Sequence, residues 1–447
     1  MRPTFRALAI VNYRRYAAGA LVSNTGTWMQ RVGQDWLVLQ LSAGDGTALG
    51  ITTGLQFLPM LLLSPYAGLV ADRFPKQRVL VATQLSMAVP AALLGLLAVT
   101  STAQTWHVYV LALLFGVGTA FDAPARQSFV VEMVGPDDLT NAVGLNSASF
   151  NLGRVVGPAA AGGLIALLGS GVAATGWVIL LNAASYLAVI ASLRTLDLDQ
   201  LHPATPARRG PGAIRDGLRY VRGRPDLVMV LTIVFFLGTF GLNFQLTTVL
   251  MATEVFDKGA GAFGLLGSIM AVGSLAGALL AARRARPRGR LVVGAAVAFC
   301  LAEIVAGVLP TYLAFAIWLP VVGISALTVI TAANTTMQLS VVPQMRGRVA
   351  ALYMMIFMGG TPLGAPIVGW VGETFGARWT LVGGGAVALV GTLAAAAFFT
   401  RSSGLVVRAH VGRHPALDVR APAAAAGPRE HLPVDPRGGW QLRRITE

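Results

Sequence analysis

The side chains best suited to chemistry lie in an apolar stretch near the start of the chain. Arg31 and Asp35 are four residues apart. Asn24 and Thr27 precede them at helical spacing, and Gln34 stands beside them, so the group shares one helix face. An ionised side chain near the centre of a bilayer costs about 2.5–3.5 kcal/mol, which marks a candidate functional site. We predict that Arg31 and Asp35 pair and line a path for protons or substrate; the alternative is a static pair that braces two helices.

Two smaller polar groups fall in later apolar stretches. Asn151 and Arg154 share a helix face, and Arg154 could attract an anionic substrate or pair with Asp35. Asn243 and Gln245 occupy the place in the second half of the chain that matches the first polar run. We expect them to line a cavity without charge, and hydrogen bonding between helices is an equally good interpretation.

A charged motif joins the second and third apolar stretches. It reads Gly68-x-x-x-Asp72-Arg73-x-x-Lys76-x-Arg78. Gly68 permits a close helix approach, and Asp72 stands at a helix end, where it can face a neighbouring helix N-terminus or an arginine. An ordinary charged loop explains the cations but not the spacing of glycine and aspartate.

Small residues recur at fixed spacing in the stretch 140–168. The pattern comprises Gly144, Gly153, Gly157, Pro158, Ala161 and Gly162. A related pattern in 348–372 contains Gly360 and Gly364, followed by alanine and proline. Such residues let helix backbones approach closely. Their recurrence indicates that the chain consists of two related halves.

Composition places these groups in a membrane protein. Of 447 residues, 55% are hydrophobic and 12% are charged, and the mean hydropathy is +0.66. Soluble proteins are about one quarter charged, so much of this apolar surface must face lipid. The net charge is +15. Because the arginines cluster between apolar runs, we attribute this charge to contact with anionic lipid and expect no binding to nucleic acid.

Twelve windows are long and apolar enough to cross a bilayer, which takes about 20 residues. They are 17–41, 47–70, 79–100, 106–124, 140–168, 173–193, 227–250, 261–282, 291–309, 311–333, 348–372 and 378–400. Strands are not expected, because the windows lack alternation with period two. Lysine and arginine gather in alternate connections, which predicts that both termini lie in the cytoplasm.

The longest internal connection divides the spans into two sets of six. We expect a cytoplasmic N-terminus at 1–16, helix bundles at 17–193 and 227–400, a cytoplasmic central loop at 194–226, and a disordered basic cytoplasmic tail at 401–447. Duplicated halves are a common plan of secondary transporters, which bind substrate near the midplane between them.

The motif that begins at Gly68 resembles the signature between helices 2 and 3 of the major facilitator superfamily, with Pro75 where the family usually has glycine. The pattern in 140–168 is similar to the antiporter signature of that family. The segment from Asp122 to Arg126 and the surrounding sequence resemble the enterobactin-exporter-like branch. The resemblance implies an all-α membrane protein whose twelve transmembrane helices form two pseudo-symmetric bundles of six.

The resemblance also implies a conformational latch, intact in one facing state and broken in the other. Its candidate members are Gly68, Asp72, Arg73, Lys76, Arg78, Asp122 and Arg126. The proton-coupled exporters of the family usually carry a basic residue inside helix 4, but the window 106–124 has none. The run with Arg31 and Asp35 is the candidate replacement. For Glu303, a protonated carboxyl that faces lipid is one interpretation.

These features predict a secondary active transporter that exports a drug, siderophore or other metabolite across the cytoplasmic membrane by alternating access, in exchange for protons. The alternatives are a facilitator-type importer and a non-transporting membrane receptor. The sequence has no phosphate-binding loop and no His/Cys cluster with metal spacing, so we expect no enzyme activity, cofactor or metal. The expected partners are a small molecule, protons and the lipid bilayer. We expect a monomer, because its two halves can form a complete site.

Overall fold

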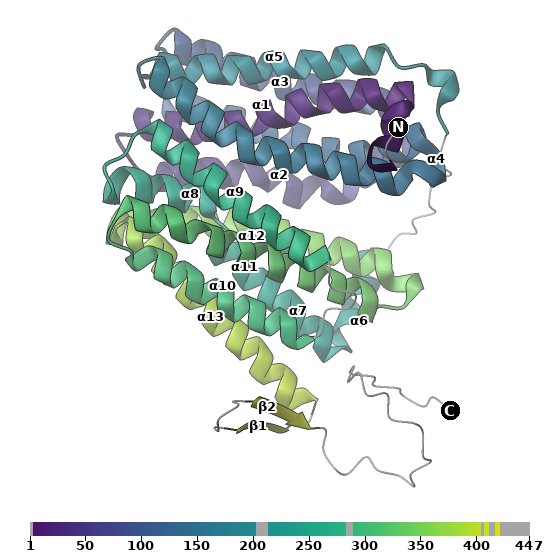
Figure 1. The fold of residues 1–447 in the computed structure, drawn as a ribbon, viewed down its shortest axis with the longest axis vertical. Coiled ribbons are helices and arrows are strands. Elements are labelled where there is room, and N and C mark those ends of the chain that lie inside the picture. Colours follow the sequence, from purple (N-terminus) through teal and green to yellow (C-terminus); the bar gives the residue numbers. More distant parts are fainter. Residues whose placement is uncertain (1–2, 203–212, 283–288, 404–405, 411–415, 421–447) are drawn as a thin grey trace.

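The computed structural model describes residues 3–202, 213–282, 289–403, 406–410 and 416–420. Nearly all of this chain is helical (Figure 1). The arginines of 203–212 and 283–288, and most of the tail predicted to be disordered, lie outside the described residues.

The first half of the chain contains one short helix and five long ones. They are the 3-10 helix η1 (Pro3–Ala9), α1 (Val11–Leu41), α2 (Gly46–Arg73), α3 (Lys76–Val99), α4 (Thr105–Leu167) and α5 (Val172–Arg194). The connection to the second half contains η2 (Leu198–Gln200) and α6 (Ala213–Arg222). The second half contains α7 (Pro225–Phe236), the π-helix η3 (Leu237–Gly241), α8 (Phe244–Leu250), the π-helix η4 (Met251–Val255), α9 (Ala260–Ala282), α10 (Gly289–Val308), α11 (Tyr312–Ser340), α12 (Pro343–Phe375) and α13 (Ala377–Ser402).

Eleven helical segments of the described chain are long and apolar enough to cross a membrane. Two of them belong to α4 and are separated at Gly135, whose φ of 67° is a left-handed conformation that suits glycine. The segments from α7 to η4 form one span, 225–255. α1 also has 31 residues, but its polar run makes it less apolar. With α1, the segments match the twelve predicted windows and confirm the predicted fold class.

The helices form two bundles. Figure 1 shows the first half of the chain above the second. Within the first half, α1 and α3 each pack on α4 and α5; within the second, α9 packs on α11 and α10 packs on α13. The most extensive contacts between the halves join α2 to α12 and α4 to α9. This arrangement agrees with the predicted duplication.

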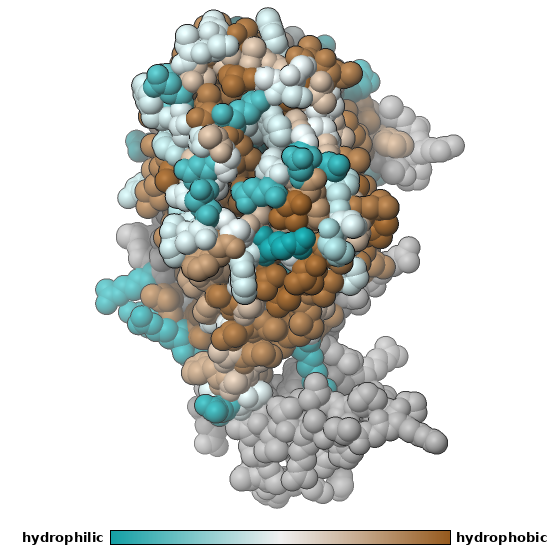
Figure 2. All heavy atoms as spheres, turned by 90° about the vertical axis from the view of Figure 1, so that its left-hand side faces the viewer, coloured by the Kyte–Doolittle hydropathy of each residue, from teal (hydrophilic) through white to brown (hydrophobic). Residues whose placement is uncertain are grey.

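Connections alternate between two ends of the bundles. One end, here named the loop face, carries the connections 42–45, 100–104, 168–171, 256–259, 309–311 and 376. The other, the terminal face, carries residue 10, the connections 74–75 and 341–342, and the described segments 195–202 and 213–224. The halves converge toward the loop face and diverge toward the terminal face (Figure 1). Figure 2 shows the loop face, where hydrophilic residues gather over the middle and hydrophobic residues surround them.

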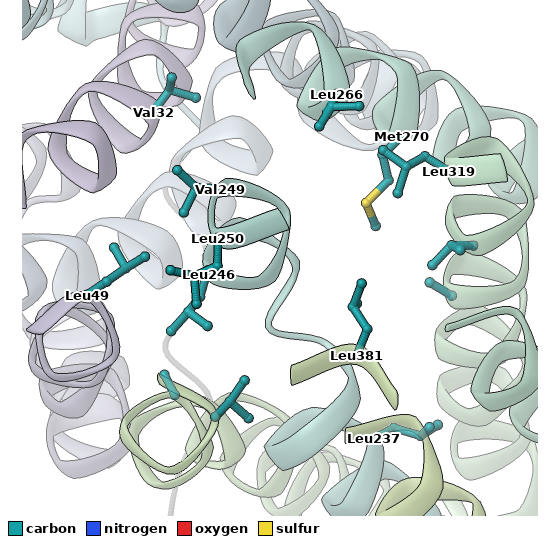
Figure 3. Packing of buried hydrophobic residues seen from close by; sticks show 14 of the residues in the cluster. Val32, Leu49, Leu237, Leu246, Val249, Leu250, Leu266, Met270, Leu319 and Leu381 are labelled. Atoms are coloured by element: carbon teal, nitrogen blue, oxygen red, sulfur yellow. The ribbon is translucent and has the colours of Figure 1, made fainter. Parts of the chain in front are cut away.

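An apolar core continues across both halves. Leu49 of α2 faces Leu246 and Leu250 of α8, and Met270 of α9 lies beside Leu319 of α11 (Figure 3). All five side chains are buried. Burial of apolar surface between α2 and α8 therefore helps to hold the first half against the second.

Glycine brings the two halves into backbone contact near the loop face. A Cβ added to Gly50 of α2 would lie 2.4 Å from the carbonyl oxygen of Ala365 in α12. A Cβ added to Gly264 of α9 would lie 2.2 Å from the carbonyl oxygen of Pro158 in α4. Any larger residue would push these helices apart, so this end of the interface depends on glycine.

The two glycine patterns have equivalent packing roles. In α4, a Cβ on Gly157 would lie 2.6 Å from the Cβ of Trp28 in α1. In α12, a Cβ on Gly364 would lie 1.6 Å from the carbonyl oxygen of Thr239 in η3. Each pattern thus packs on the first span of its own half, and the residues that follow pack on the other half. Gly144 differs, because nothing lies within 4 Å of its added Cβ.

Two short strands lie in the segment predicted to be disordered. β1 (Val406–His410) and β2 (Ala416–Arg420) pair antiparallel, with Val406 opposite Arg420. Valine favours extended backbone, and both strands contain it. The described structure therefore contains one antiparallel pair of strands within the region predicted to be disordered.

We expect Gly364→Ala to destabilise the protein by about 1–3 kcal/mol, because the added methyl group would overlap the backbone of η3. Gly383→Ala is the matched control: Gly383 also lies in a helix, but nothing is within 4 Å of its added Cβ. Melting temperatures of the two variants in detergent check the prediction. Equal melting temperatures would show that the close approach of α12 and η3 is not required.

Candidate functional site

The guanidinium group of Arg31 lies over aromatic rings. Its central carbon is 4.6 Å from the ring centroid of Trp28 and 5.6 Å from that of Phe57. Among the described residues, no ion pair within 4 Å joins Arg31 to Asp35. The predicted pair is therefore wrong for this conformation, because the guanidinium group turns toward the rings. Cation–π attraction accounts for this orientation.

Asp35 is a buried carboxyl group. The residue is 5% exposed, and its Oδ2 has no hydrogen-bond partner among the described residues. The neighbouring Gln34 is also buried and donates to Oε1 of Gln56 in α2 at 2.8 Å. Asn24 donates to Oγ of Ser149 in α4 at 3.1 Å. Gln34 and Asn24 thus make hydrogen bonds between helices, while Asp35 retains an unused acceptor.

Arg154 lies against the same aromatic ring as Arg31. Its central carbon is 5.8 Å from the Trp28 centroid, and Nη2 donates to Oγ of Ser274 in α9 at 3.2 Å. Because α4 and α9 belong to different halves, Arg154 lies at their interface. Asn151 donates to the carbonyl oxygen of Ser147 in its own helix. The suggested pair of Arg154 with Asp35 does not form within 4 Å among the described residues.

A break in the first span of the second half positions Asn243. The helix ends at Gly241 and resumes at Phe244. Nδ2 of Asn243 donates to the carbonyl oxygen of Thr239 at 2.8 Å, and its buried Oδ1 has no partner among the described residues. Gln245 is partly exposed. Interrupted spans often expose backbone groups at binding sites of transporters, so this break is a second candidate region.

A polar cluster between α1 and α5 is a group that the sequence analysis missed. Asn182 donates to Gln30 and to Oη of Tyr186, which lies 3.2 Å from Oγ1 of Thr27. Ser185 donates to Oδ1 of Asn182 at 2.9 Å. A signal was present, because Asn182, Ser185 and Tyr186 recur at helical spacing in an apolar span.

Glu303 is buried inside the second half. Its residue is 0% exposed, and neither carboxyl oxygen has a hydrogen-bond partner among the described residues. A Cβ added to Gly241 would lie 3.1 Å from Oε2, and one added to Gly384 would lie 3.9 Å from Oε1. The interpretation of Glu303 as a lipid-facing group is therefore wrong. α10 points it toward the broken span and α13.

Two ion pairs lie toward the terminal face of the first half. Asp122 is 7% exposed and accepts hydrogen bonds from Thr83 and Gln84 of α3 and from Arg126, each at 2.7–2.9 Å. Lys76 pairs with Glu132 of α4 at 2.5 Å, a partner that the sequence analysis missed.

The other predicted members of the latch lie around these two pairs. Gly68 is buried, Asp72 is partly buried, and Arg73 and Arg78 are exposed. The predicted latch residues therefore lie at one end of the first half. The contacts of Asp122 with Thr83 and Gln84, and the pair of Lys76 with Glu132, join α3 to α4 within that half.

Comparisons with known proteins agree with this architecture. A family model described as a transmembrane secretion effector matches residues 3–415. The multidrug efflux pump Tap of Mycolicibacterium fortuitum is 29% identical over 381 residues, which cover 81% of this chain and 90% of Tap. The staphyloferrin A transporter of Staphylococcus aureus is 34% identical over 143 residues, only 32% of this chain and 36% of that protein. The crystal structure of a mutant of the nucleoside transporter NupG has a TM-score of 0.70 at 14% identity, covering 87% of this chain and 100% of that chain.

We expect Glu303→Gln to leave the stability nearly unchanged. An ionised carboxylate buried without a cation would cost several kcal/mol, so Glu303 should be the neutral acid, which glutamine resembles in size and charge. Asp122→Asn is the contrasting variant, because it removes the charge that faces Arg126 and should cost about 3–5 kcal/mol. Melting temperatures in detergent check both. A large loss of stability in Glu303→Gln would contradict the neutral acid.

Proposed function

Because the chain belongs to the transmembrane secretion effectors of the major facilitator superfamily, we propose that it exports a small molecule across the cell membrane in exchange for protons. Members of this superfamily are multi-pass membrane transporters of small molecules and not enzymes. The observation that carries the proposal is Asp35, a buried carboxyl group of α1 whose Oδ2 has no hydrogen-bond partner among the described residues. The relatives that are named efflux pumps support the outward direction.

The positions at which the halves touch support alternating access. Two close backbone approaches between the halves, Gly50 with Ala365 and Gly264 with Pro158, lie near the loop face. The bundles diverge toward the terminal face (Figure 1). Rotation of one half against the other about the central polar groups would open the loop face and close the terminal face, as in transporters with duplicated halves.

The orientation in the membrane is the second part of the proposal. We place the terminal face, with both chain ends, in the cytoplasm. The support is the distribution of cations, since Arg6, Lys76, Arg126, Arg224 and Arg348 all lie at this face. In this orientation the described conformation is closed toward the outside.

Proton exchange at Asp35 gives the cycle its driving force. A protonated Asp35 is compatible with its buried position, whereas the ionised form would favour access to water or to the cation of Arg31. Alternate protonation from outside and release inside would let the proton gradient bias the two conformations. A monomer suffices, because both halves of the site belong to one chain.

We expect Asp35→Asn to lose transport that is driven by a pH gradient but to retain exchange of substrate down its own gradient. Proteoliposomes with two xanthene dyes of opposite charge, 5-carboxyfluorescein and rhodamine 6G, provide the measurement. Glu254→Gln is the control, since Glu254 is exposed near the loop face. If the gradient moves neither dye, or if wild type and Asp35→Asn behave alike, the proposal of proton exchange fails.

The terminal-face charges are the proposed conformational latch. We expect Asp72→Asn to shift the ratio of inward-facing to outward-facing molecules by about tenfold, equivalent to about 1.4 kcal/mol. The reason is that the substitution removes the negative charge at the end of α2, which can face a neighbouring helix N-terminus or an arginine. Accessibility of single cysteines at the two faces measures the ratio. Unchanged transport together with an unchanged ratio would reject the latch.

A further inference from the structure

Two arginines lie near one indole ring, and one of them reaches the interface of the halves. Arg31 approaches the ring of Trp28 from its own helix at 4.6 Å, and Arg154 approaches it from α4 at 5.8 Å. The hydrogen bond from Arg154 to Ser274 of α9 ties this group to the second half. Phe57 of α2 adds a second ring, 5.6 Å from the Arg31 guanidinium. The group thus combines two cations and two aromatic faces drawn from three helices.

The positive charge of this group exceeds the negative charge of the acidic residues near it in the described chain. Neither guanidinium group has a carboxylate within 4 Å among the described residues, and buried Nε of Arg31 donates to no acceptor there. Asp35 is the acidic residue that follows Arg31 by one helical turn, so the group holds two cations for one nearby acid. Two guanidinium groups around one ring repel each other, and an anion between them would relieve this repulsion.

The geometry of the side chains specifies the kind of anion. A guanidinium group is planar and donates two parallel hydrogen bonds to a carboxylate. Indole and phenyl rings offer flat faces on which another aromatic ring can stack. A lysine pair would attract any anion, but arginine beside tryptophan favours a planar one.

We propose that the exported substrate is an aromatic carboxylate, whose acid group binds Arg31 and Arg154 and whose ring packs against the neighbouring aromatic side chains Trp28 and Phe57. This inference rests on the proposed function, because it identifies the substrate class of the same transporter. Contact with Arg154 would also join the substrate to α9 through Ser274. Substrate binding would then act on contacts in both halves of the protein.

The test is binding of the two xanthene dyes to purified protein in nanodiscs, measured by fluorescence anisotropy. The anionic 5-carboxyfluorescein should bind at least about tenfold more tightly than rhodamine 6G, which has the same ring system and a positive charge. Arg31→Gln and Arg154→Gln should each weaken binding of the anion by about tenfold, and Arg31→Lys should restore part of it. Arg401→Gln, an exposed change at the end of α13, should have no effect.

Each outcome bears on the inference separately from the proposed function. Equal or tighter binding of rhodamine 6G, no binding of either dye by folded wild type, or unaltered anion binding in both glutamine variants would overturn it. Arginine-dependent binding of the anion without gradient-driven transport would support the substrate class and contradict proton-coupled export. Export of rhodamine 6G alone would support export and contradict the substrate class.

Discussion

The close approach of helix backbones at glycine is the constraint on which the other features depend. Gly50 against Ala365 and Gly264 against Pro158 leave no room for a side chain, so α2 with α12 and α4 with α9 meet in one register. Because the contacts lie near the loop face, they fix the end at which the molecule is closed. The same short approaches bring Arg154 of α4 to the interface of the two halves.

The polar groups inside the bundles differ between the halves, although the helix packing is duplicated. The first half contains Arg31 and Arg154 together with the buried Asp35, whose Oδ2 accepts no hydrogen bond among the described residues. The second half contains Asn243 at a helix break and Glu303 behind it. The helix packing is thus duplicated while the buried polar groups are not, so the two halves are chemically unequal.

The sequence was sufficient for the fold but only partly for the site. Lengths of apolar windows and glycine spacing are properties of single helices, and they predicted the spans and the packing of Gly157 and Gly364. Side-chain partners depend on how helices face each other. Spacing alone could not show that Arg31 turns to Trp28 instead of pairing with Asp35. Spacing also could not show the π-helical break before Asn243, because no residue pattern in this segment indicates where the helix is interrupted.

Distances across both faces of the molecule test the central claim, alternating access controlled by protons, most directly. Spin labels at the exposed positions Phe74 and Arg346 report on the terminal face, and labels at Ala43 and Lys258 report on the loop face. Cys300 is the only cysteine and is buried, so it should not react. Between acidic and alkaline buffer, the account predicts that the two distance distributions change in opposite directions. Distributions that stay fixed at both faces, or that widen together, would contradict it.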